Sequence, residues 1–280
     1  REEGRIKRCD LHVHTIHSDG TDTPEALIAA AARKELSCVA ITDHDSVEGV
    51  EAAIAAGLRL GVEVIPGIEL TAEEDGLEVH MLGYMVEHRD PEFNRRLTGL
   101  RENRIERIHA MVAKLKDQGV TLPPESVFKL SAGGTVGRLH MARAMVNEGI
   151  VKNIYEAFNK YIGDRCPSYV AHFQLSPAEA IALVREFGGI PVLAHPYVLR
   201  RDEIIPVLAE AGLGGIEVYY PEHTQSMINF YRNEALRLHL LMTGGSDYHG
   251  AAKPNVSLGE IDVPYELAEG LREAKLRGGR

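Results

Sequence analysis

The strongest constraint on the fold of this chain is a repeated order in which a short apolar strand precedes an amphipathic helix. Runs of strand length are DLHVH, LSCVAITDHD, VEVIPGIEL, LEVHMLGYMV, IPVLAHP, GIEVYY and LLMTGGSDYH, and helical patterns such as PEALIAAAARKE lie between many of them. Helix starts are marked at Thr23-Pro24 and by a capping box at Ser176-Pro-Ala-Glu179. This order is typical of an α/β fold in which strands and helices alternate around a barrel.

The alternation stops between residues 86 and 180. There, FNRRLTGLRENRIERIHAMVAKLKDQG predicts one long helix, and TVGRLHMARAMVNEG predicts another after Pro123-Pro124 and the turn at Gly133-Gly134. We therefore expect a discontinuous barrel made of residues 1–85 and 181–280. A mostly helical insertion at 86–180 interrupts it.

Charge is distributed unevenly between these two parts. The formal net charge is −10, yet residues 86–180 hold 14 Lys and Arg against 11 Asp and Glu, a net +3. An acidic barrel can hold cations, and a basic insertion can hold an anionic group, although a chance fluctuation is the alternative. The overall charge argues against a stable complex with duplex nucleic acid, and the sequence does not define an oligomeric state.

The three cysteines are widely spaced and form no CxxC pair, which argues against a disulfide framework and fits a reducing cytoplasm. No apolar run reaches the length of a membrane span, and the charged start REEGRIKR is unlike a signal peptide. We therefore expect a cytoplasmic protein that does not bind a membrane.

Histidines and carboxylates gather where the predicted strands end. In HVH the two imidazoles leave the same face of a strand, close enough to share one ion, although an exposed polar strand would also explain this segment alone. The same residue types recur along the chain, at His12, His14, Asp19, His44, Glu69, His80, His195, Asp247 and His249. Because barrel enzymes build their active sites at the carboxyl ends of their strands, this recurrence predicts a metal cluster. Imidazole and carboxylate ligands without thiolate suit Mn²⁺, Fe²⁺ or Zn²⁺ in a hydrolytic site.

At these residues the chain resembles the PHP (polymerase and histidinol phosphatase) family. HxH after the first strand, TDHD after the second, a Glu after the third, and the later AHP and SDxH are the family's motifs. The resemblance implies a distorted seven-stranded β/α barrel that holds two to three divalent ions, with Mn²⁺ expected and Fe²⁺ or Zn²⁺ as alternatives. It also implies phosphoester hydrolysis.

Carried over by position, the resemblance divides the ligands among three ions. The first ion would take His12, His14, Glu69 and Asp247, the second Asp19, His44 and His249, and the third His80 and His195, with Glu69 as a shared bridge. His17 competes with Asp19 for its place. Asp43 and Asp45, which flank His44, would either orient ligand imidazoles or cap the turn.

Within the insertion, Arg138 and Lys160 are our candidates for phosphate contacts, because Arg binds phosphate through two parallel bonds and Lys adds a point charge. A solvated helix face is the alternative for both. RxHxAR, FxKY, YVAH and EVxxxxH resemble the bacterial nucleoside-3′,5′-bisphosphate phosphatases, relatives of a 5′-to-3′ oligoribonuclease. The resemblance implies substrate contacts from Arg138, His140, Arg143, Lys160 and His223. His140 or His223 would protonate the leaving oxygen.

This narrower resemblance implies a small phosphorylated nucleotide or short oligonucleotide as substrate. The 3′-phosphate of a nucleoside 3′,5′-bisphosphate would be removed to leave the 5′-nucleotide, and short 5′-phosphorylated RNA would be cut from its 5′ end. The alternatives are a histidinol-phosphate or other small phosphomonoester phosphatase, a proofreading exonuclease module, and a metal-binding protein without catalysis. The exonuclease module is disfavoured because no polymerase sequence is attached.

Overall fold

The computed structural model describes residues 7–171 and 175–278 and places eight strands in one sheet. Seven of them correspond to the expected strands, and the eighth is a two-residue addition. The strands are β1 (Arg8–Val13), β2 (Cys38–Ile41), β3 (Glu63–Glu74), β4 (Leu77–Tyr84), β5 (Ile190–Leu193), β6 (Gly215–Tyr219), β7 (Leu241–Gly244) and β8 (Val263–Pro264).

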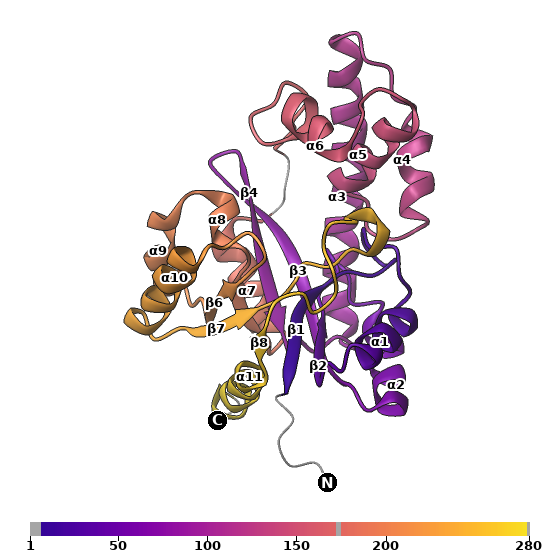
Figure 1. Ribbon diagram of the computed structural model, residues 1–280. Coiled ribbons are helices and arrows are strands. Elements are labelled where there is room, and N and C mark those ends of the chain that lie inside the picture. Colours follow the sequence, from indigo (N-terminus) through magenta and orange to yellow (C-terminus); the bar gives the residue numbers. More distant parts are fainter. Residues whose placement is uncertain (1–6, 172–174, 279–280) are drawn as a thin grey trace.

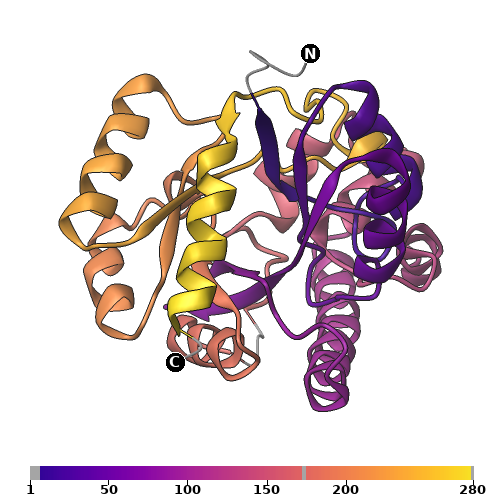
Figure 2. The same cartoon turned by 90° about the horizontal axis from the view of Figure 1, so that it is seen from below.

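The sheet curls into a nearly closed barrel (Figure 2). Its strand order is β7-β6-β5-β4-β3-β2-β1-β8, so β1 lies near the open side. Beyond the end of β7, the amide of Asp247 donates to the carbonyl of His12 at 2.9 Å, and the amide of His14 donates to the carbonyl of Tyr248 at 2.8 Å. These bonds bring the two ends of the sheet together and confirm the expected distorted barrel.

The β3–β4 pair is antiparallel and interrupts the parallel pattern. Its tight turn passes through Asp75 and Gly76, which both have positive φ. We expected His80 at the carboxyl end of its strand, and this expectation was wrong because β4 runs in the reverse direction. His80 pairs instead with Thr71, two residues beyond Glu69, so the antiparallel register returns its imidazole to the end of the barrel where Glu69 lies.

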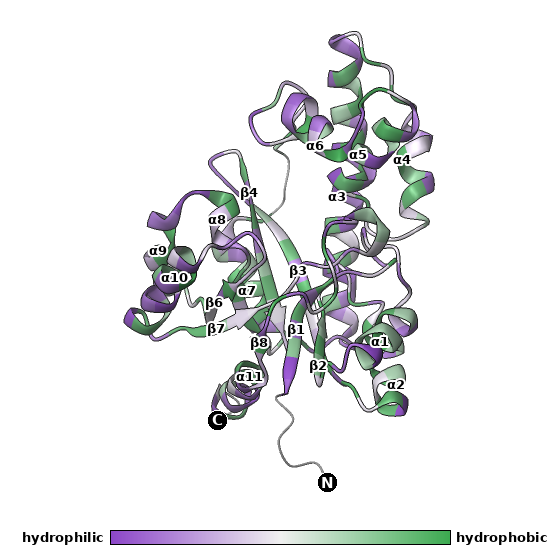
Figure 3. Ribbon diagram, in the orientation of Figure 1, coloured by the Kyte–Doolittle hydropathy of each residue, from purple (hydrophilic) through white to green (hydrophobic). Residues whose placement is uncertain are grey.

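Helices cover the outside of the barrel (Figure 2). Two starts match the sequence signals, because Thr23 Oγ1 accepts from the amide of Ala26, and Ser176 and Glu179 form the capping box. The short strand β2 (CVAI) is apolar throughout, whereas the helices carry both polar and apolar residues (Figure 3). The outer helices are α1 (Pro24–Arg33), α2 (Val50–Leu60), α7 (Pro177–Glu186), α8 (Pro196–Leu199), α9 (Ile205–Glu210), α10 (Gln225–Arg237) and α11 (Tyr265–Gly278).

The region between β4 and α7 forms a helical lobe beside the barrel (Figure 1). It consists of α3 (Pro91–Asp117), α4 (Pro124–Ser131), α5 (Arg138–Asn147), α6 (Ile154–Ala157) and a π-helical turn at Phe158–Ile162. The lobe has its own apolar core around Ile108, Met111 and Met145. The first turns of α3 pack instead on the barrel core through Phe93 and Leu97, so α3 belongs to both parts.

All three cysteines are free, as expected. Among the helices of the described residues, none is both long and apolar enough to pass through a bilayer.

Candidate metal centre and substrate pocket

Glu69, which is 1% exposed, is the centre of the predicted ligand set. Its Oε2 lies 3.2 Å from His12 Nε2, 3.1 Å from His14 Nε2 and 3.3 Å from His44 Nδ1. Its other oxygen, Oε1, lies 3.0 Å from His80 Nδ1 and 3.2 Å from His195 Nε2. The two carboxylate oxygens therefore face different sets of imidazoles, as a bridging ligand requires.

A second group forms around Asp19 in the loop after β1. Asp19 Oδ1 lies 3.1 Å from His249 Nε2, and Asp19 Oδ2 lies 3.8 Å from His44 Nε2. The competing residue His17 points elsewhere: its ring is 30% exposed and lies 3.7 Å from Glu48. The structure therefore brings Asp19, and not His17, to the cluster.

Asp247 closes the cluster from the loop after β7. Its Oδ1 lies 3.2 Å from His14 Nε2 and 3.5 Å from His12 Nε2. Its Oδ2 accepts hydrogen bonds from Lys253 Nζ at 2.7 Å and from the Tyr220 hydroxyl at 3.1 Å. Only one oxygen of Asp247 therefore faces the imidazoles. Sequence reasoning missed Lys253 and Tyr220 because neither belongs to a ligand motif.

The nine predicted ligands fit a multinuclear site for divalent ions. Their ligand atoms form four overlapping groups in which all atoms lie within 4.8 Å of one another. Several of these atoms are buried without any hydrogen bond, namely His12 Nε2, His14 Nε2, Asp19 Oδ1, His44 Nδ1 and His80 Nδ1. Because buried polar atoms are nearly always satisfied, these atoms point to bound cations. The nitrogen and oxygen donor set suits Mn²⁺, Fe²⁺ or Zn²⁺.

The cluster is strongly polarised. Burial favours the neutral acids, but the surrounding imidazoles outweigh it and hold the pKa of Asp19 and of Glu69 well below the usual range. Burial likewise disfavours charged imidazoles. Nearby carboxylates nevertheless raise the pKa of His14 to about 9 and the pKa of His80 to about 10. The carboxylates therefore stay ionised and available as ligands.

Comparison with known proteins agrees with this geometry. Residues 10–165 match the model of the PHP domain, which is more than half of the chain. The chain belongs to the PHP family. It is 37% identical to a phosphoribosyl 1,2-cyclic phosphate 1,2-diphosphodiesterase of Eggerthella lenta, over 86% of this chain and 94% of that protein. It is 31% identical to a 3′,5′-nucleoside bisphosphate phosphatase of Chromobacterium violaceum, over 91% and 92%.

A solved structure supports the same assignment. The structure, described as a metal-dependent phosphoesterase from Bifidobacterium adolescentis, superposes with a TM-score of 0.86 and 31% identity and covers 96% of each chain. The expected fold and the expected class of enzyme, a metal-dependent hydrolase of phosphoric esters, are confirmed by these relatives.

Glu217 of β6 is a further part of this PHP site that the sequence reasoning did not assign. It is fully buried, its Oε1 lies 2.9 Å from His12 Nδ1, and its Oε2 accepts the backbone amide of His195 at 2.7 Å. One carboxylate thus orients two ligands. His195 has a positive φ of 25°, a conformation that L-residues rarely adopt, and the hydrogen bond from its amide to Glu217 helps to sustain it. The only sequence signal was one charge inside the apolar run GIEVYY.

Asp43 caps the loop after β1, whereas Asp45 is paired with Arg104 of α3. Asp43 accepts hydrogen bonds from the amide and hydroxyl of Thr15 and from the hydroxyl of Ser18, at 2.6 to 2.7 Å. Asp45 accepts from the guanidinium of Arg104 and from the amide of Thr71. Neither carboxylate accepts a hydrogen bond from an imidazole of the described residues, but the Ser18 hydroxyl that donates to Asp43 also lies 3.4 Å from His14 Nδ1, so Asp43 is linked to one predicted ligand through Ser18. Asp43 acts on the loop that carries Asp19.

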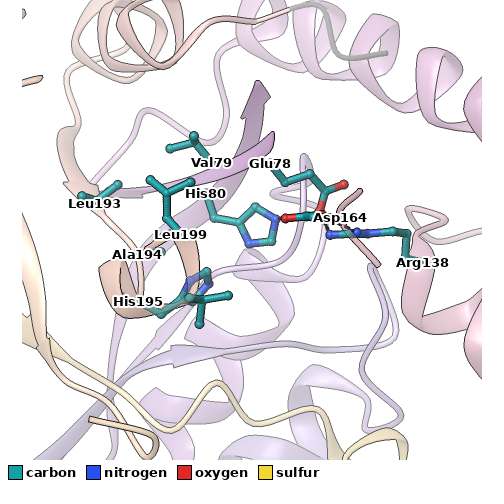
Figure 4. Close-up of a pocket in the computed structure, with 10 residues that line it drawn as sticks. Glu78, Val79, His80, Arg138, Asp164, Leu193, Ala194, His195 and Leu199 are labelled. Carbon is teal, nitrogen blue, oxygen red and sulfur yellow. Dashed lines mark hydrogen bonds and ion pairs between the residues drawn. The ribbon is translucent and has the colours of Figure 1, made fainter. Parts of the chain in front are cut away.

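Arg138 lies in a pocket next to the metal ligands. The pocket has a volume of about 50 Å³ and is lined by His80 and His195 of the cluster and by Arg138 of the insertion (Figure 4). The Arg138 guanidinium donates to Asp164 Oδ1 at 2.7 Å and is also paired with Glu78. Arg138 is thus placed where the phosphate-contact prediction needs it, already held by two carboxylates.

The other predicted substrate residues occupy different environments. Lys160 is 60% exposed, pairs with Glu156 at 2.5 Å, and is absent from the linings of the described pockets. Arg143 is partly buried on α5. His172 of the YVAH motif falls outside the described residues. The structure therefore brings Arg138, and not Lys160, to the metal cluster.

The two candidate acids differ in their bonding. His140 Nδ1 accepts from the amide of Gly137 at 3.2 Å, and burial lowers the pKa of His140 to about 4. His223 Nδ1 lies 2.8 Å from the carbonyl of Val218 and must carry the proton, because a carbonyl only accepts. His223 Nε2 is then unprotonated in the neutral ring and is buried without a partner.

Proposed function

We propose that the chain removes the 3′-phosphate from nucleoside 3′,5′-bisphosphates such as adenosine 3′,5′-bisphosphate. The observation that carries this proposal is the position of Arg138, a guanidinium in the same pocket as the metal ligands His80 and His195. A substrate with two phosphates can place one over the ions and the other against Arg138. The relative from Chromobacterium violaceum, which carries this activity in its name, supports the proposal.

Divalent ions held by the nine ligands would lower the pKa of a coordinated water toward neutrality and offset charge on the phosphoryl oxygens. We expect two to three ions, with Mn²⁺ as the metal. The chain's own contribution is to hold the ligands still, and Glu217 does so for His12 and His195. Arg138 would fix the second phosphate, so that binding energy becomes alignment for attack.

His140 suits the leaving oxygen better than His223. With Nδ1 occupied as an acceptor, the neutral His140 ring carries its proton on Nε2 and can donate a hydrogen bond. The neutral His223 ring presents an unprotonated Nε2 and cannot donate there. His140 would therefore stabilise the oxygen as it leaves, and His223 would keep an indirect role.

A second candidate is supported by the relative from Eggerthella lenta, whose name specifies a phosphoribosyl 1,2-cyclic phosphate. This compound and a nucleoside bisphosphate share a ribose with a 5-phosphate and a second phosphoester on the ring. The same pocket would hold the 5-phosphate in both, and only the ester over the ions would differ. Short 5′-phosphorylated RNA would bind in the same pose, and we expect slow release of 5′-mononucleotides from it.

The deciding experiment is product analysis after incubation with Mn²⁺. Adenosine 3′,5′-bisphosphate should yield 5′-AMP and phosphate, much faster than 3′-AMP loses its phosphate, because 3′-AMP lacks the group that Arg138 holds. Accumulation of 3′-AMP from the bisphosphate would mean that the 5′-phosphate, and not the 3′-phosphate, lies over the ions. That result would refute the proposed orientation of the substrate. Parallel assays with the 1,2-cyclic phosphate and with histidinol phosphate separate the alternatives. A cytoplasmic location stays a prediction.

A further inference from the structure

Glu78 lies between the metal cluster and the substrate pocket, although no motif includes it. It precedes His80 by two residues on β4, so strand alternation places both side chains on one face. Its side chain is 8% exposed. Figure 4 shows Glu78, His80, Arg138 and Asp164 together in the pocket.

Glu78 contacts one metal ligand and two arginines. Its Oε2 lies 3.6 Å from His80 Nε2 and is also paired with Arg138, while its Oε1 lies 2.8 Å from Arg107. The two arginines come from α5 and α3 of the helical lobe. Glu78 is therefore a strand residue of the barrel that is paired with two helices of the lobe.

The contact to His80 has a defined geometry. His80 Nδ1 faces Glu69 at 3.0 Å and has no hydrogen bond, whereas Nε2 faces Glu78. A ligating imidazole uses one nitrogen for the ion and commonly directs the other N–H to a carboxylate, which fixes its tautomer and orientation. Glu78 lies on this side of His80 at 3.6 Å, an ion-pair distance, whereas Glu217 lies within hydrogen-bond distance of His12 at 2.9 Å.

The contact to Arg138 is shared with Asp164. The guanidinium is held between Glu78 and Asp164, and its NH1 also donates to the carbonyl of Ile162 at 3.2 Å. Removing Asp164 would loosen Arg138 without touching His80. Removing Glu78 would loosen both.

We propose that Glu78 is a positioning residue that orients His80 and Arg138 together and so couples the metal cluster to the substrate pocket. The Arg138 half rests on the proposed function, in which Arg138 holds a substrate phosphate. The His80 half does not depend on the substrate.

The test compares Glu78→Gln with Asp164→Asn. Mn²⁺ binding is measured by equilibrium dialysis with elemental analysis, and KM and kcat are measured with adenosine 3′,5′-bisphosphate at saturating Mn²⁺. Glu78→Gln should weaken binding of the last Mn²⁺ equivalent by about 10- to 100-fold and also raise KM. Asp164→Asn should raise KM and leave Mn²⁺ binding unchanged. If Glu78→Gln shows only one of its two effects, or neither, the coupling is refuted.

Because Glu78→Gln leaves the buried guanidinium of Arg107 and the partly buried guanidinium of Arg138 near a neutral amide, its thermal midpoint is measured as well. If it fails to fold, Glu78→Gln combined with Arg107→Met removes one of these charges, and Arg107→Met alone is its reference. Arg107→Met should keep wild-type Mn²⁺ affinity, and the double variant should lose it; equal affinities would refute the proposal. If the wild type hydrolyses no bisphosphate, the proposed function fails, and the same comparison is made with the 1,2-cyclic phosphate.

Discussion

The metal cluster and the substrate pocket share two histidines but are built differently. The cluster ligands lie on strands of one barrel or in the loops directly after them, and most are buried. The pocket combines barrel residues with Arg138 and Asp164 from the helical lobe. The cluster is therefore fixed by one sheet, whereas the pocket depends on how two parts of the chain meet. Changes to the cluster should act mainly on metal binding and turnover, and changes to the pocket mainly on substrate affinity.

The largest effect is expected for Glu69→Gln, since Glu69 faces five imidazoles through two oxygens. Loss of a bridging carboxylate should weaken two ions at once. The fall in kcat should therefore exceed the roughly 10- to 100-fold that is typical for a residue that only supports a ligand. Elemental analysis and phosphate release measure the two losses. Glu74→Gln on the same strand is the control, and a Glu69 variant with full metal content and activity would contradict the assignment.

Arg138→Ala should separate the two regions. Losing one charge-assisted contact to a phosphate costs about 1.5–3 kcal/mol, which corresponds to about 10- to 150-fold in KM for the bisphosphate. The KM of a simple phosphomonoester and the Mn²⁺ content should change little, because Arg138 contacts no metal ligand directly. Equal effects on both substrates would show that Arg138 does not bind the second phosphate.

Metal binding should tighten as the pH rises. Carboxylates raise the pKa of His14 to about 9 and of His80 to about 10, so after chelation both rings are protonated at pH 7 and must lose that proton to bind an ion. For each proton that the ion displaces, the association constant for Mn²⁺ should rise about tenfold with each unit increase in pH, as long as the pH is below these pKa values. Calorimetry in buffers of different ionisation enthalpy counts the released protons. Binding that is independent of pH between 7 and 8.5 would contradict these pKa values.

Glu217→Gln tests whether a residue that hydrogen-bonds a predicted ligand, without being a ligand itself, contributes to Mn²⁺ binding. The neutral amide accepts the His12 Nδ1–H less strongly, so it orients the ring less well and no longer raises its basicity as a ligand, and we expect about 10- to 100-fold weaker Mn²⁺ binding with a smaller change in KM. Glu222→Gln, at an exposed residue that follows the same strand, is the matched control. If both variants bind Mn²⁺ equally well, Glu217 does not orient the predicted ligands for metal binding.

The cluster could be predicted from the sequence because ligand chemistry selects residue types, and strand ends select their positions. The structure brings all nine predicted ligands together in four overlapping groups. The direction of β4 could not be predicted, since an apolar run reads the same in a parallel or antiparallel strand. The two-residue β8 is shorter than any hydrophobic pattern can reveal.

The supporting residues could not be predicted for a related reason. Glu217 and Glu78 are single charges whose role arises only from contacts with distant segments, whereas Lys253 reaches Asp247, six residues away, but belongs to no ligand motif. Arg138 was predicted as a phosphate contact, and that role stays a prediction; its pairing with Glu78 requires the lobe to be placed against the barrel, and its pairing with Asp164 joins two segments of the lobe. Sequence patterns report local structure, and these ion pairs are long-range.

The smallest effect is expected for Lys160→Ala, and it sharpens the distinction between cluster and pocket. The sequence predicts Lys160 as a phosphate contact, yet its side chain is 60% exposed and pairs with Glu156 one helical turn away. An exposed ionic interaction is worth about 0–1 kcal/mol of free energy. Losing the attraction between Lys160 and the substrate phosphate should therefore raise the KM for the bisphosphate less than about fivefold. The residual effect should shrink with added salt, because an exposed charge acts on a distant phosphate only through screened attraction. A rise of tenfold or more that persists in high salt would instead mean that Lys160 reaches the bound phosphate, and the pocket would then extend farther into the lobe than Arg138.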